Sequence, residues 1–270
     1  MPLVSTRGAA SAQGFGEFAQ VTAANYIEDV FSTYLYTGTG AALTITNNID
    51  TSTYGGLTWI KGRSGATGHR LTDTARGATK SLASETTAAE ATEATGLTAF
   101  GTTGFTIGAD ADYNTSSATY ASWTFREQPK FFDVVTYTGT GSNTTIAHSL
   151  GSVPGSIIVK RTDTTAAWAV YHRSLANTDY LTLNTTAAAA TGATRWNSTT
   201  ATSAVFSLGT DASVNASGGT YVAYLFAHDA GGFGLAGTDN VISCGTFTAG
   251  TGSVNLGYEP QWIMFKGFTG

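Results

Sequence analysis

Short runs of apolar, β-branched and aromatic residues, separated by turns rich in Gly, Asn and Thr, recur along most of the chain. Runs of this kind predict β-strands of an antiparallel sandwich rather than helices. Residues 221–227 are apolar on both faces, so we place that strand at the centre of a sheet, with one side against an opposing sheet. In the middle of the chain, the predicted strands are residues 133–137, 144–148, 157–160, 168–172, 180–183, 204–208 and 221–227.

Several motifs recur in the same order at one offset of 101 residues. Matches spread over most of a unit at a single offset indicate a tandem duplication of a domain of about 100 residues. Asn114 and Asn215 also match at this offset. The longer matching pairs are residues 36–40 with 137–141, 105–110 with 206–211, and 119–125 with 220–226.

A third copy begins near Asn240. Residues 150–157 reappear as 256–263 at an offset of 106, so that Lys160 matches Lys266. A domain cut about a third of the way through could not bury a core, so we expect a longer natural chain or a partner that supplies the missing strands. The intact mass of the native protein would decide. The predicted units are an N-terminal anchoring arm (1–28), β-sandwich repeats 1 (29–130) and 2 (131–236), and the start of an incomplete third repeat (237–270).

Two segments do not follow the strand pattern. Residues 80–95 are rich in Thr and Ala and lack an apolar stripe, which predicts an exposed loop. Residues 1–28 match no part of the repeat and combine small residues with Phe15, Phe18 and Tyr26. We interpret them as an extended arm that becomes ordered against a partner.

Composition narrows the function classes. Charged residues make up 11% of the chain, against roughly 25% in a typical soluble domain, and the net charge of −5 excludes a basic stripe for nucleic acid. The apolar runs are too short to span a bilayer, and the N-terminus lacks the apolar core of a signal peptide. The single cysteine, Cys244, excludes an internal disulfide or a Cys-based zinc site and is interpreted as a small buried hydrophobe.

Candidate chemistry is sparse, and the sequence predicts no catalytic, cofactor-binding or metal-binding residues. Residues 14–19 resemble a dinucleotide fingerprint but follow no strand. His69-Arg70 aligns with His172-Arg173 at an offset of 103, which we interpret as a framework hydrogen-bonding element, with a ligand contact as the alternative. Most acids lie in turn-like contexts, where Asp stabilises the bend: Asp110, Asp112, Asp163, Asp211 and Asp239.

Asparagines and aromatic side chains each have a structural and a functional interpretation. Five Asn-x-Ser/Thr sequons occur, and without a signal peptide we interpret them as a polar surface: Asn114, Asn143, Asn184, Asn197 and Asn215. The aromatics of the closing strands are expected in the core: Tyr120, Trp123, Tyr221, Tyr224 and Phe226. Those in the middle of the second unit could instead form a sugar-stacking surface: Trp168, Tyr171, Tyr180 and Trp196.

The sequence resembles the β-repeat domains of tail-fibre-like and other virion-associated proteins of tailed bacteriophages. The resemblance covers about residues 30–270, and residues 1–16 are similar to fibre attachment segments. The first copy departs from the pattern at residues 53–56 (Thr-Tyr-Gly-Gly), where the later copies have Leu-Gly-x-x-Pro. The motifs that carry it are residues 36–40 and 137–141, residues 148–160, and residues 215–227.

This resemblance implies a structural virion protein, most simply the proximal part of a tail fibre, made in the host cytoplasm and serving host adsorption. Such fibres are homotrimers of all-β, jelly-roll or lectin-like sandwiches, and residues 1–28 would dock to the tail, baseplate or an adaptor. A host-surface glycan would be contacted by a distal region. The alternatives are a carbohydrate-binding adhesin module and, third, a tailspike-type depolymerase. We expect no enzymatic activity, cofactor, nucleic-acid binding or membrane insertion.

Overall fold

The computed structural model describes residues 24–248, 250 and 253–269 of the chain. Most of the arm predicted for residues 1–28 therefore lies outside the described residues. At the start of the described chain, the backbone N–H of Gly234 donates to the carbonyl of Asn25 (2.9 Å). A one-turn 3-10 helix, η2 (Ile27–Asp29), then leads into the first strand. The entry to the first repeat is thus held by the loop that follows the second.

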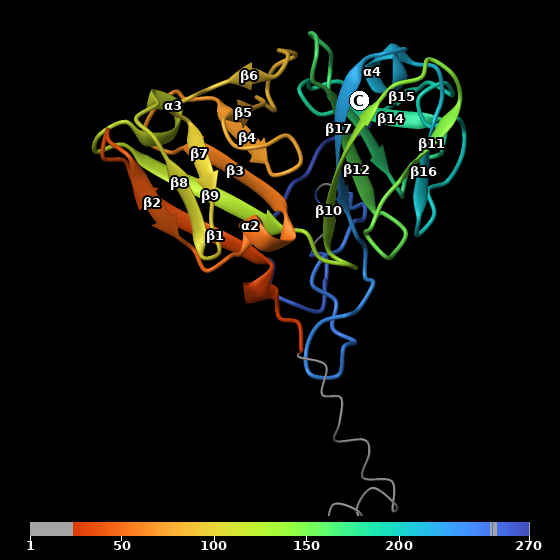
Figure 1. Ribbon diagram of the computed structural model, residues 1–270. Helices are drawn as coiled ribbons and strands as arrows, with labels where there is room; N and C mark the ends of the chain where they lie inside the picture. The colour runs from red at the N-terminus through yellow and green to blue at the C-terminus, as the bar shows by residue number, and fades with distance from the viewer. Residues whose placement is uncertain (1–23, 249, 251–252, 270) are drawn as a thin grey trace, which may run out of the picture.

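The first repeat is a mostly β unit with three antiparallel sheets and two one-turn helices (Figure 1). A four-stranded sheet of order β1-β9-β3-β4 faces a three-stranded sheet of order β2-β8-β7. Tyr36, Ile60 and Tyr120 of the larger sheet and Ile45 and Phe105 of the smaller share one core. The elements are β1 (Phe31–Thr37), β2 (Leu43–Thr46), α2 (Thr51–Tyr54), β3 (Gly56–Gly62), β4 (His69–Asp73), β5 (Lys80–Ser81), β6 (Ala91–Thr92), β7 (Leu97–Phe100), β8 (Gly104–Ile107), α3 (Ala111–Asn114) and β9 (Thr119–Arg126).

The second repeat has the same chain path around a larger sheet. Its six strands follow the order β10-β17-β12-β13-β14-β15, and the small sheet is the pair β11-β16. Ile157, Val159 and Tyr221 of the large sheet pack with Phe206 and Leu208 of the small one. The elements are β10 (Phe132–Thr138), β11 (Thr144–Ala147), β12 (Ser156–Arg161), β13 (Ala169–His172), β14 (Asp179–Thr182), β15 (Ala190–Thr191), β16 (Val205–Leu208), α4 (Ala212–Asn215) and β17 (Thr220–Phe226).

These elements confirm the mostly β, antiparallel fold class and the strand positions predicted for residues 131–236. The strand predicted to be central, β17, lies between β10 and β12 and is buried on both faces. Both repeats place a tyrosine of the first strand opposite a tyrosine of the closing strand. The Tyr36 and Tyr120 rings stack with centroids 5.1 Å apart, and those of Tyr137 and Tyr221 with centroids 5.0 Å apart.

A fully buried asparagine explains why the repeat motifs recur. The Asn215 Oδ1 accepts from the N–H of Thr140 (2.7 Å), and its Nδ2 donates to the carbonyls of Gly209 (2.6 Å) and Ser142 (2.7 Å). Asn114 makes the equivalent bonds in the first repeat. One side chain thus ties the opening turn of each repeat to the loop before its closing strand. Both residues are sequons buried in the fold, which corrects their assignment to a polar surface.

The glycine that opens the same turn is required by close backbone contact. A Cβ at Gly139 would lie 2.3 Å from the carbonyl oxygen of Ala216, and one at Gly38 would lie 2.2 Å from that of Thr115. Side chains other than hydrogen do not fit at such distances. The Tyr-Thr-Gly portion of the motif is therefore a requirement of the fold.

The departure of the first repeat at residues 53–56 has a local structural counterpart. Asp50 caps the one-turn helix α2 by accepting from the N–H of Thr53 (2.9 Å). The chain then passes through Gly55 at φ 85° into β3, a left-handed conformation that glycine adopts without strain. A short capped helix replaces the Leu-Gly-x-x-Pro turn, and the following strand keeps its place in the sheet.

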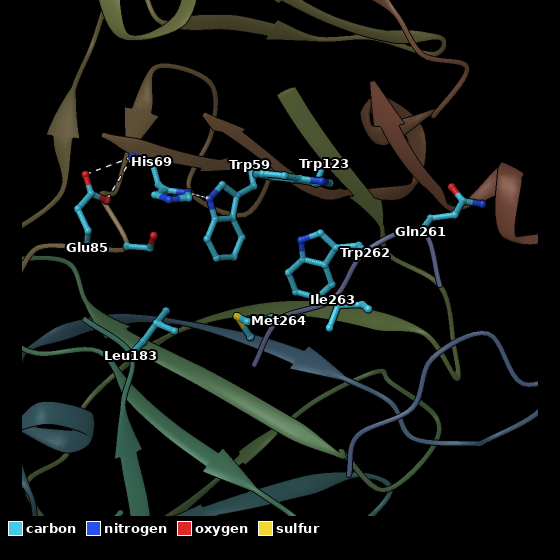
Figure 2. A pocket seen from close by; sticks show the side chains of 10 residues that line it. Trp59, His69, Glu85, Trp123, Leu183, Gln261, Trp262, Ile263 and Met264 are labelled. Atoms are coloured by element: carbon cyan, nitrogen blue, oxygen red, sulfur yellow. Dashed lines mark hydrogen bonds between the residues drawn. The ribbon is translucent and has the colours of Figure 1, made fainter. Parts of the chain in front are cut away.

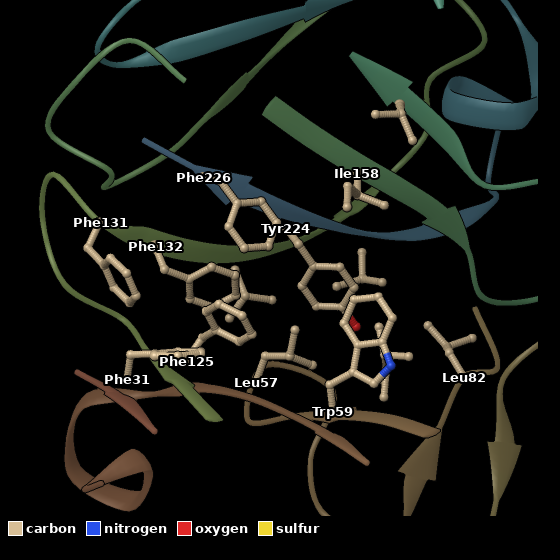
Figure 3. Close-up of a cluster of buried hydrophobic side chains, with 14 of the residues drawn as sticks. Phe31, Leu57, Trp59, Leu82, Phe125, Phe131, Phe132, Ile158, Tyr224 and Phe226 are labelled. Carbon is tan, nitrogen blue, oxygen red and sulfur yellow. The ribbon is translucent and has the colours of Figure 1, made fainter. Parts of the chain in front are cut away.

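The large sheets of the two repeats face each other across one apolar core, which we call the junction core (Figure 3). Leu57 and Phe125 from the first repeat meet Phe132, Tyr224 and Phe226 from the second. The Phe125 ring centroid lies 5.5 Å from that of Phe132 and 5.6 Å from that of Phe226. Burying one such side chain contributes on the order of 2–3 kcal/mol. The layers therefore run small sheet, large sheet, large sheet, small sheet, with apolar packing at every boundary.

Residues 80–95 only partly fit the predicted exposed loop. They contain β5 and β6, and Leu82 and Ala83 between them are buried. The indole N–H of Trp168 in the second repeat donates to the carbonyl of Ala83 (3.1 Å). The prediction was wrong for residues 80–84 because the second repeat covers them, a contact that local sequence does not reveal.

The predicted third repeat forms no strand among the described residues of 237–270. This segment instead returns to the junction of the two repeats. Trp262 lies with its ring centroid 5.3 Å from that of Phe125 and 6.2 Å from that of Phe226. Its assignment to an incomplete repeat stays a prediction at this point.

Candidate functional site

A cleft of about 540 Å³ opens where the two repeats and the C-terminal segment meet (Figure 2). Three tryptophans line it: Trp59 from β3, Trp123 from β9 and Trp262. Strand pairing sets Trp59 directly opposite Trp123, with ring centroids 6.4 Å apart. The Trp262 ring lies 6.3 Å from that of Trp59. Segments far apart in sequence thus build one aromatic surface.

Polar groups at one end of the cleft are held in fixed roles. The Trp59 indole N–H donates to Nδ1 of His69 (2.8 Å), so the neutral imidazole carries its proton on Nε2. Burial lowers the pKa of His69, although the nearby Glu85 carboxylate opposes that effect. Glu85 in turn accepts from the backbone N–H of His69 (3.1 and 3.2 Å). This end of the cleft offers a neutral donor beside a carboxylate, an arrangement suited to contact with a polar surface.

The alignment of His69 with His172 was wrong. His69 lies opposite Lys61 in the sheet, whereas His172 lies opposite Ser156, at the other end of the equivalent strand. Lys61 and Lys160 occupy equivalent places, because they pair with Ala121 and Val222 of the closing strands. The two His-Arg pairs therefore match in sequence by coincidence of spacing, and only His69 lines the cleft.

The aromatics suggested for a sugar-stacking surface do not form one. Trp168 and Trp196 are fully buried, and Tyr171 packs edge-on against Trp196 with ring centroids 5.8 Å apart. Tyr180 is half-buried beneath the Arg195 guanidinium, whose carbon lies 3.3 Å from the ring centroid. Of the closing-strand aromatics, Trp123 is half-buried and faces the cleft. The core assignment is confirmed for the other four: Tyr120, Tyr221, Tyr224 and Phe226.

A buried ionic cluster joins the two repeats beside the junction core. The Arg76 guanidinium bonds to the carboxylates of Asp73 (2.6 Å) and Glu90 (3.2 Å) and donates to the hydroxyl of Tyr224 (3.2 Å). The Tyr224 hydroxyl donates to Asp73 (2.7 Å). Burial opposes the charge on Arg76, but Tyr224 and Asp73 raise its pKa overall. Because Tyr224 belongs to the second repeat, the cluster fixes how the repeats meet.

A carboxyl pair lies at the connection between the repeats. Burial, and then repulsion from Asp133, raises the pKa of Glu127 to about 7. Asp133 accepts from the backbone N–H of Ser149 (2.6 Å), and the N–H of Glu127 donates to the carbonyl of Gly55 (3.0 Å). The Asp133 carboxylate and the backbone of Glu127 are thus held at the repeat boundary, where burial favours the protonated form of the Glu127 carboxyl group.

The remaining candidate residues have structural roles. Asp110 and Asp211 cap α3 and α4 by accepting from backbone N–H groups, and Asp163 pairs with Arg161 (2.8 Å), as their turn-like contexts predicted. Burial raises the pKa of the Cys244 thiol to about 12, and the side chain packs against the junction core, but it is half-buried, so its interpretation as a small buried hydrophobe is confirmed only in part. Among the described residues, no cluster of His, Cys, Asp and Glu is arranged to hold a metal ion. No helix within the described ranges is long and apolar enough to cross a membrane.

The sequence did not identify the tryptophan cleft. Two sequence alignments between the repeats could have predicted part of it: Lys61 with Lys160, and Trp123 with Tyr224. Together they place Trp59 and Trp123 opposite each other on one face of the sheet. The third tryptophan has no such signal, because its place depends on how the C-terminal segment folds back.

Comparison with known proteins places the chain in a family. No curated protein and no solved structure matches it. A family model described as a domain of unknown function (DUF7483) matches residues 27–270, which include both repeats, the junction core and the segment that carries Trp262. The chain therefore belongs to the DUF7483 family.

Proposed function

We propose that this chain is a structural protein of a tailed-phage virion, most simply the proximal part of a tail fibre, which acts by attachment rather than catalysis. The observation that carries the proposal is the junction core, in which the large sheets of two sandwiches share one apolar interior. Domains joined by flexible linkers move independently, whereas domains that share a large apolar interface do not. Stiffness of this kind is what a fibre needs to transmit contact from its tip to the tail.

The ionic cluster supports the same function. Arg76 is nearly inaccessible and bonds at once to Asp73 of its own repeat and Tyr224 of the next. Opening the junction would keep the ion pairs of Arg76 with Asp73 and Glu90, which lie within the first repeat, but it would break both hydrogen bonds of the Tyr224 hydroxyl, to Arg76 (3.2 Å) and to Asp73 (2.7 Å). The two repeats thus resist both bending and sliding.

The finer parts of the proposal follow the phage resemblance. Each repeat, with a large sheet facing a small one, is a jelly-roll or lectin-like sandwich, and the assembled fibre is a homotrimer. Residues 1–28 dock to the tail, the baseplate or an adaptor, and a distal region touches a host-surface glycan. The protein is made in the host cytoplasm and is located in the virion.

The experiment that tests the proposal is location in the particle. Purified virions of a phage that encodes this chain are analysed by mass spectrometry and by immunogold electron microscopy with antibodies against residues 29–236. We expect the chain in the particles and the label on the tail. Absence from washed particles would overturn the proposal, and label on the capsid would replace the fibre with a head decoration protein.

A carbohydrate-binding adhesin is the second candidate, and the tryptophan cleft is the observation that favours it. A sugar stacks on an exposed indole face. Trp59, however, is only 7% exposed, so Trp123 and Trp262 would have to supply the stacking face. The test is binding of the chain to a glycan array. The adhesin would be favoured if binding is lost in Trp123→Ala and if the glycans bound do not include cell-surface glycans of a phage host.

A further inference from the structure

The C-terminal segment carries the same strand pattern as β3 and β12. Lys266 aligns with Lys61 and Lys160, and this places Ile263 and Phe265 at the positions of Ile157 and Val159 in the second repeat. In β12 those two side chains point into the core between the large and small sheets and are 0% exposed.

The contacts of this segment repeat those that join the first two units. Lys160 of the second repeat donates from Nζ to the carbonyl of Thr87, in the loop between β5 and β6 (3.3 Å). Lys266 donates in the same way to Thr185, in the corresponding loop between β14 and β15 (2.7 Å). The third segment is thus docked on the second repeat by the bond that docks the second repeat on the first.

A backbone hydrogen bond repeats with the same geometry. The N–H of Glu90, just before β6, donates to the carbonyl of Thr162 (2.9 Å). The N–H of Ala189, just before β15, donates to the carbonyl of Phe268 (3.0 Å). Thr162 and Phe268 each lie two residues beyond the aligned lysine. Two independent bonds therefore set the segment in the register of a repeat.

The outer face of residues 262–266, which we define as the face with Trp262 and Met264, meets the junction core as the outer faces of β3 and β12 do. Leu57 and Trp59 of β3 and Ile158 of β12 point into that core, and Trp262 joins them. Met264, at the position of Trp59 and Ile158, lines the tryptophan cleft. The outer faces of three equivalent segments thus converge on one apolar centre.

The inner face of residues 262–266, which carries Ile263 and Phe265, differs from the inner face of β12. Ile263 is 65% exposed and Phe265 is 76% exposed, although their counterparts in the second repeat are completely buried. Among the described residues, no strand pairs with residues 262–266. In each repeat, the strand at this place pairs antiparallel with the closing strand, β9 or β17. An exposed apolar face beside unpaired backbone is a site for strand addition.

We infer that residues 262–266 are the first central strand of a third repeat, docked in register, and that their open face receives a closing strand of the β9 and β17 kind from a third unit in the same polypeptide. The third large sheet would cover the tryptophan cleft and complete a ring of three sandwiches around the junction core. A second folded copy cannot supply this strand, because its two closing strands are already paired on both sides: β9 with β1 and β3, and β17 with β10 and β12. The inference does not depend on the virion proposal.

The test supplies a closing strand to the open face of residues 262–266. Residue 270 corresponds to residue 164 at the offset of 106, so residues 165–236 are appended after Gly270. Hydrogen exchange is measured on peptides that cover residues 262–266, with light scattering on the same samples. We expect a monomer in both chains and protection of residues 262–266 that rises at least about 100-fold on extension.

Every other outcome overturns the inference. Unchanged exchange at residues 262–266 overturns it whether or not the appended copy of residues 165–236 folds. In the second repeat, residues 165–236 fold against β12, so they should fold against an equivalent strand. Protection already present in an oligomeric, unextended chain would assign the face to a second copy.

Two variants confirm the face. In the extended chain, the double variant Ile263→Asp, Phe265→Asp should return the exchange of residues 262–266 to the unextended rate, and Leu235→Asp, at a side chain 90% exposed, should not. In the unextended chain the double variant should leave the urea midpoint unchanged. A lowered midpoint there would show that the face is already buried and would refute the inference.

Discussion

Replacing Asn215 by alanine tests the claim that one buried amide holds the opening turn of each repeat. The side chain makes three hydrogen bonds, to Thr140, Ser142 and Gly209, all between 2.6 and 2.7 Å. Each net hydrogen bond contributes about 1 kcal/mol, and a buried N–H or C=O left without a partner costs about 1–3 kcal/mol. The bond to Gly209 is buried, whereas those to Thr140 and Ser142 are partly exposed, so the loss of three bonds with one buried carbonyl left unpaired should lower the free energy of unfolding of Asn215→Ala by about 3–5 kcal/mol.

The assay is urea unfolding followed by tryptophan fluorescence and circular dichroism. The matched control is Asn143→Ala, an exposed asparagine of the same opening turn, which should change the free energy of unfolding by less than about 0.5 kcal/mol. Asn215→Asp should destabilise at least as much as alanine, because a carboxylate would face the carbonyls of Gly209 and Ser142. If Asn215→Ala unfolds within about 0.5 kcal/mol of the native chain, the buried amide does not hold the turn.

Three further predictions concern the junction and the thiol. Glu127 has its folded pKa raised from 4.5 to about 7, so its contribution is present below pH 4.5 and is lost as the pH rises through 7. Urea midpoints at pH 5 and pH 8 should show a loss of about 1–2 kcal/mol, after allowance for partial exposure, that Glu127→Gln abolishes; an unchanged pH dependence would contradict the assignment. Phe226→Ala should cost about 3–5 kcal/mol and leave a single unfolding transition reported by both repeats, whereas two separate transitions would refute a shared core. Cys244 in the native chain should resist alkylation by iodoacetamide at pH 8, because burial holds its pKa at about 12, and rapid alkylation before unfolding would contradict that burial.

The sequence predicted what depends on local pattern and missed what depends on packing between repeats. Strands such as β12 and β17 were predictable because their side chains alternate toward two cores, and turn residues mark their ends. The burial of Leu82 was not, because the second repeat provides the cover. The same holds for the tryptophan cleft, since Trp262 reaches Trp59 only through the return of the C-terminal segment.

The positions of the histidines show a different limit. An alignment by offset treats spacing as equivalence, but insertions between strands shift the offset from 101 at the closing strands to 99 at the central ones. His69 and His172 therefore aligned by sequence offset, although they lie at opposite ends of equivalent strands. Strand pairing, which a single sequence does not contain, was needed to correct it.

Burial on both faces of the large sheets has a consequence for what the repeats can do. In β17, Tyr221, Ala223 and Leu225 face the small sheet, whereas Val222 and Tyr224 face the other repeat. A sandwich without its neighbour would expose Val222 and Tyr224 to water, and large contiguous apolar patches on a surface mark interaction sites. The duplication therefore gives each large sheet a neighbour that covers its outer apolar face. In this chain the other repeat supplies that cover, since Val222 and Tyr224 share the junction core with Leu57 and Phe125 of the first repeat.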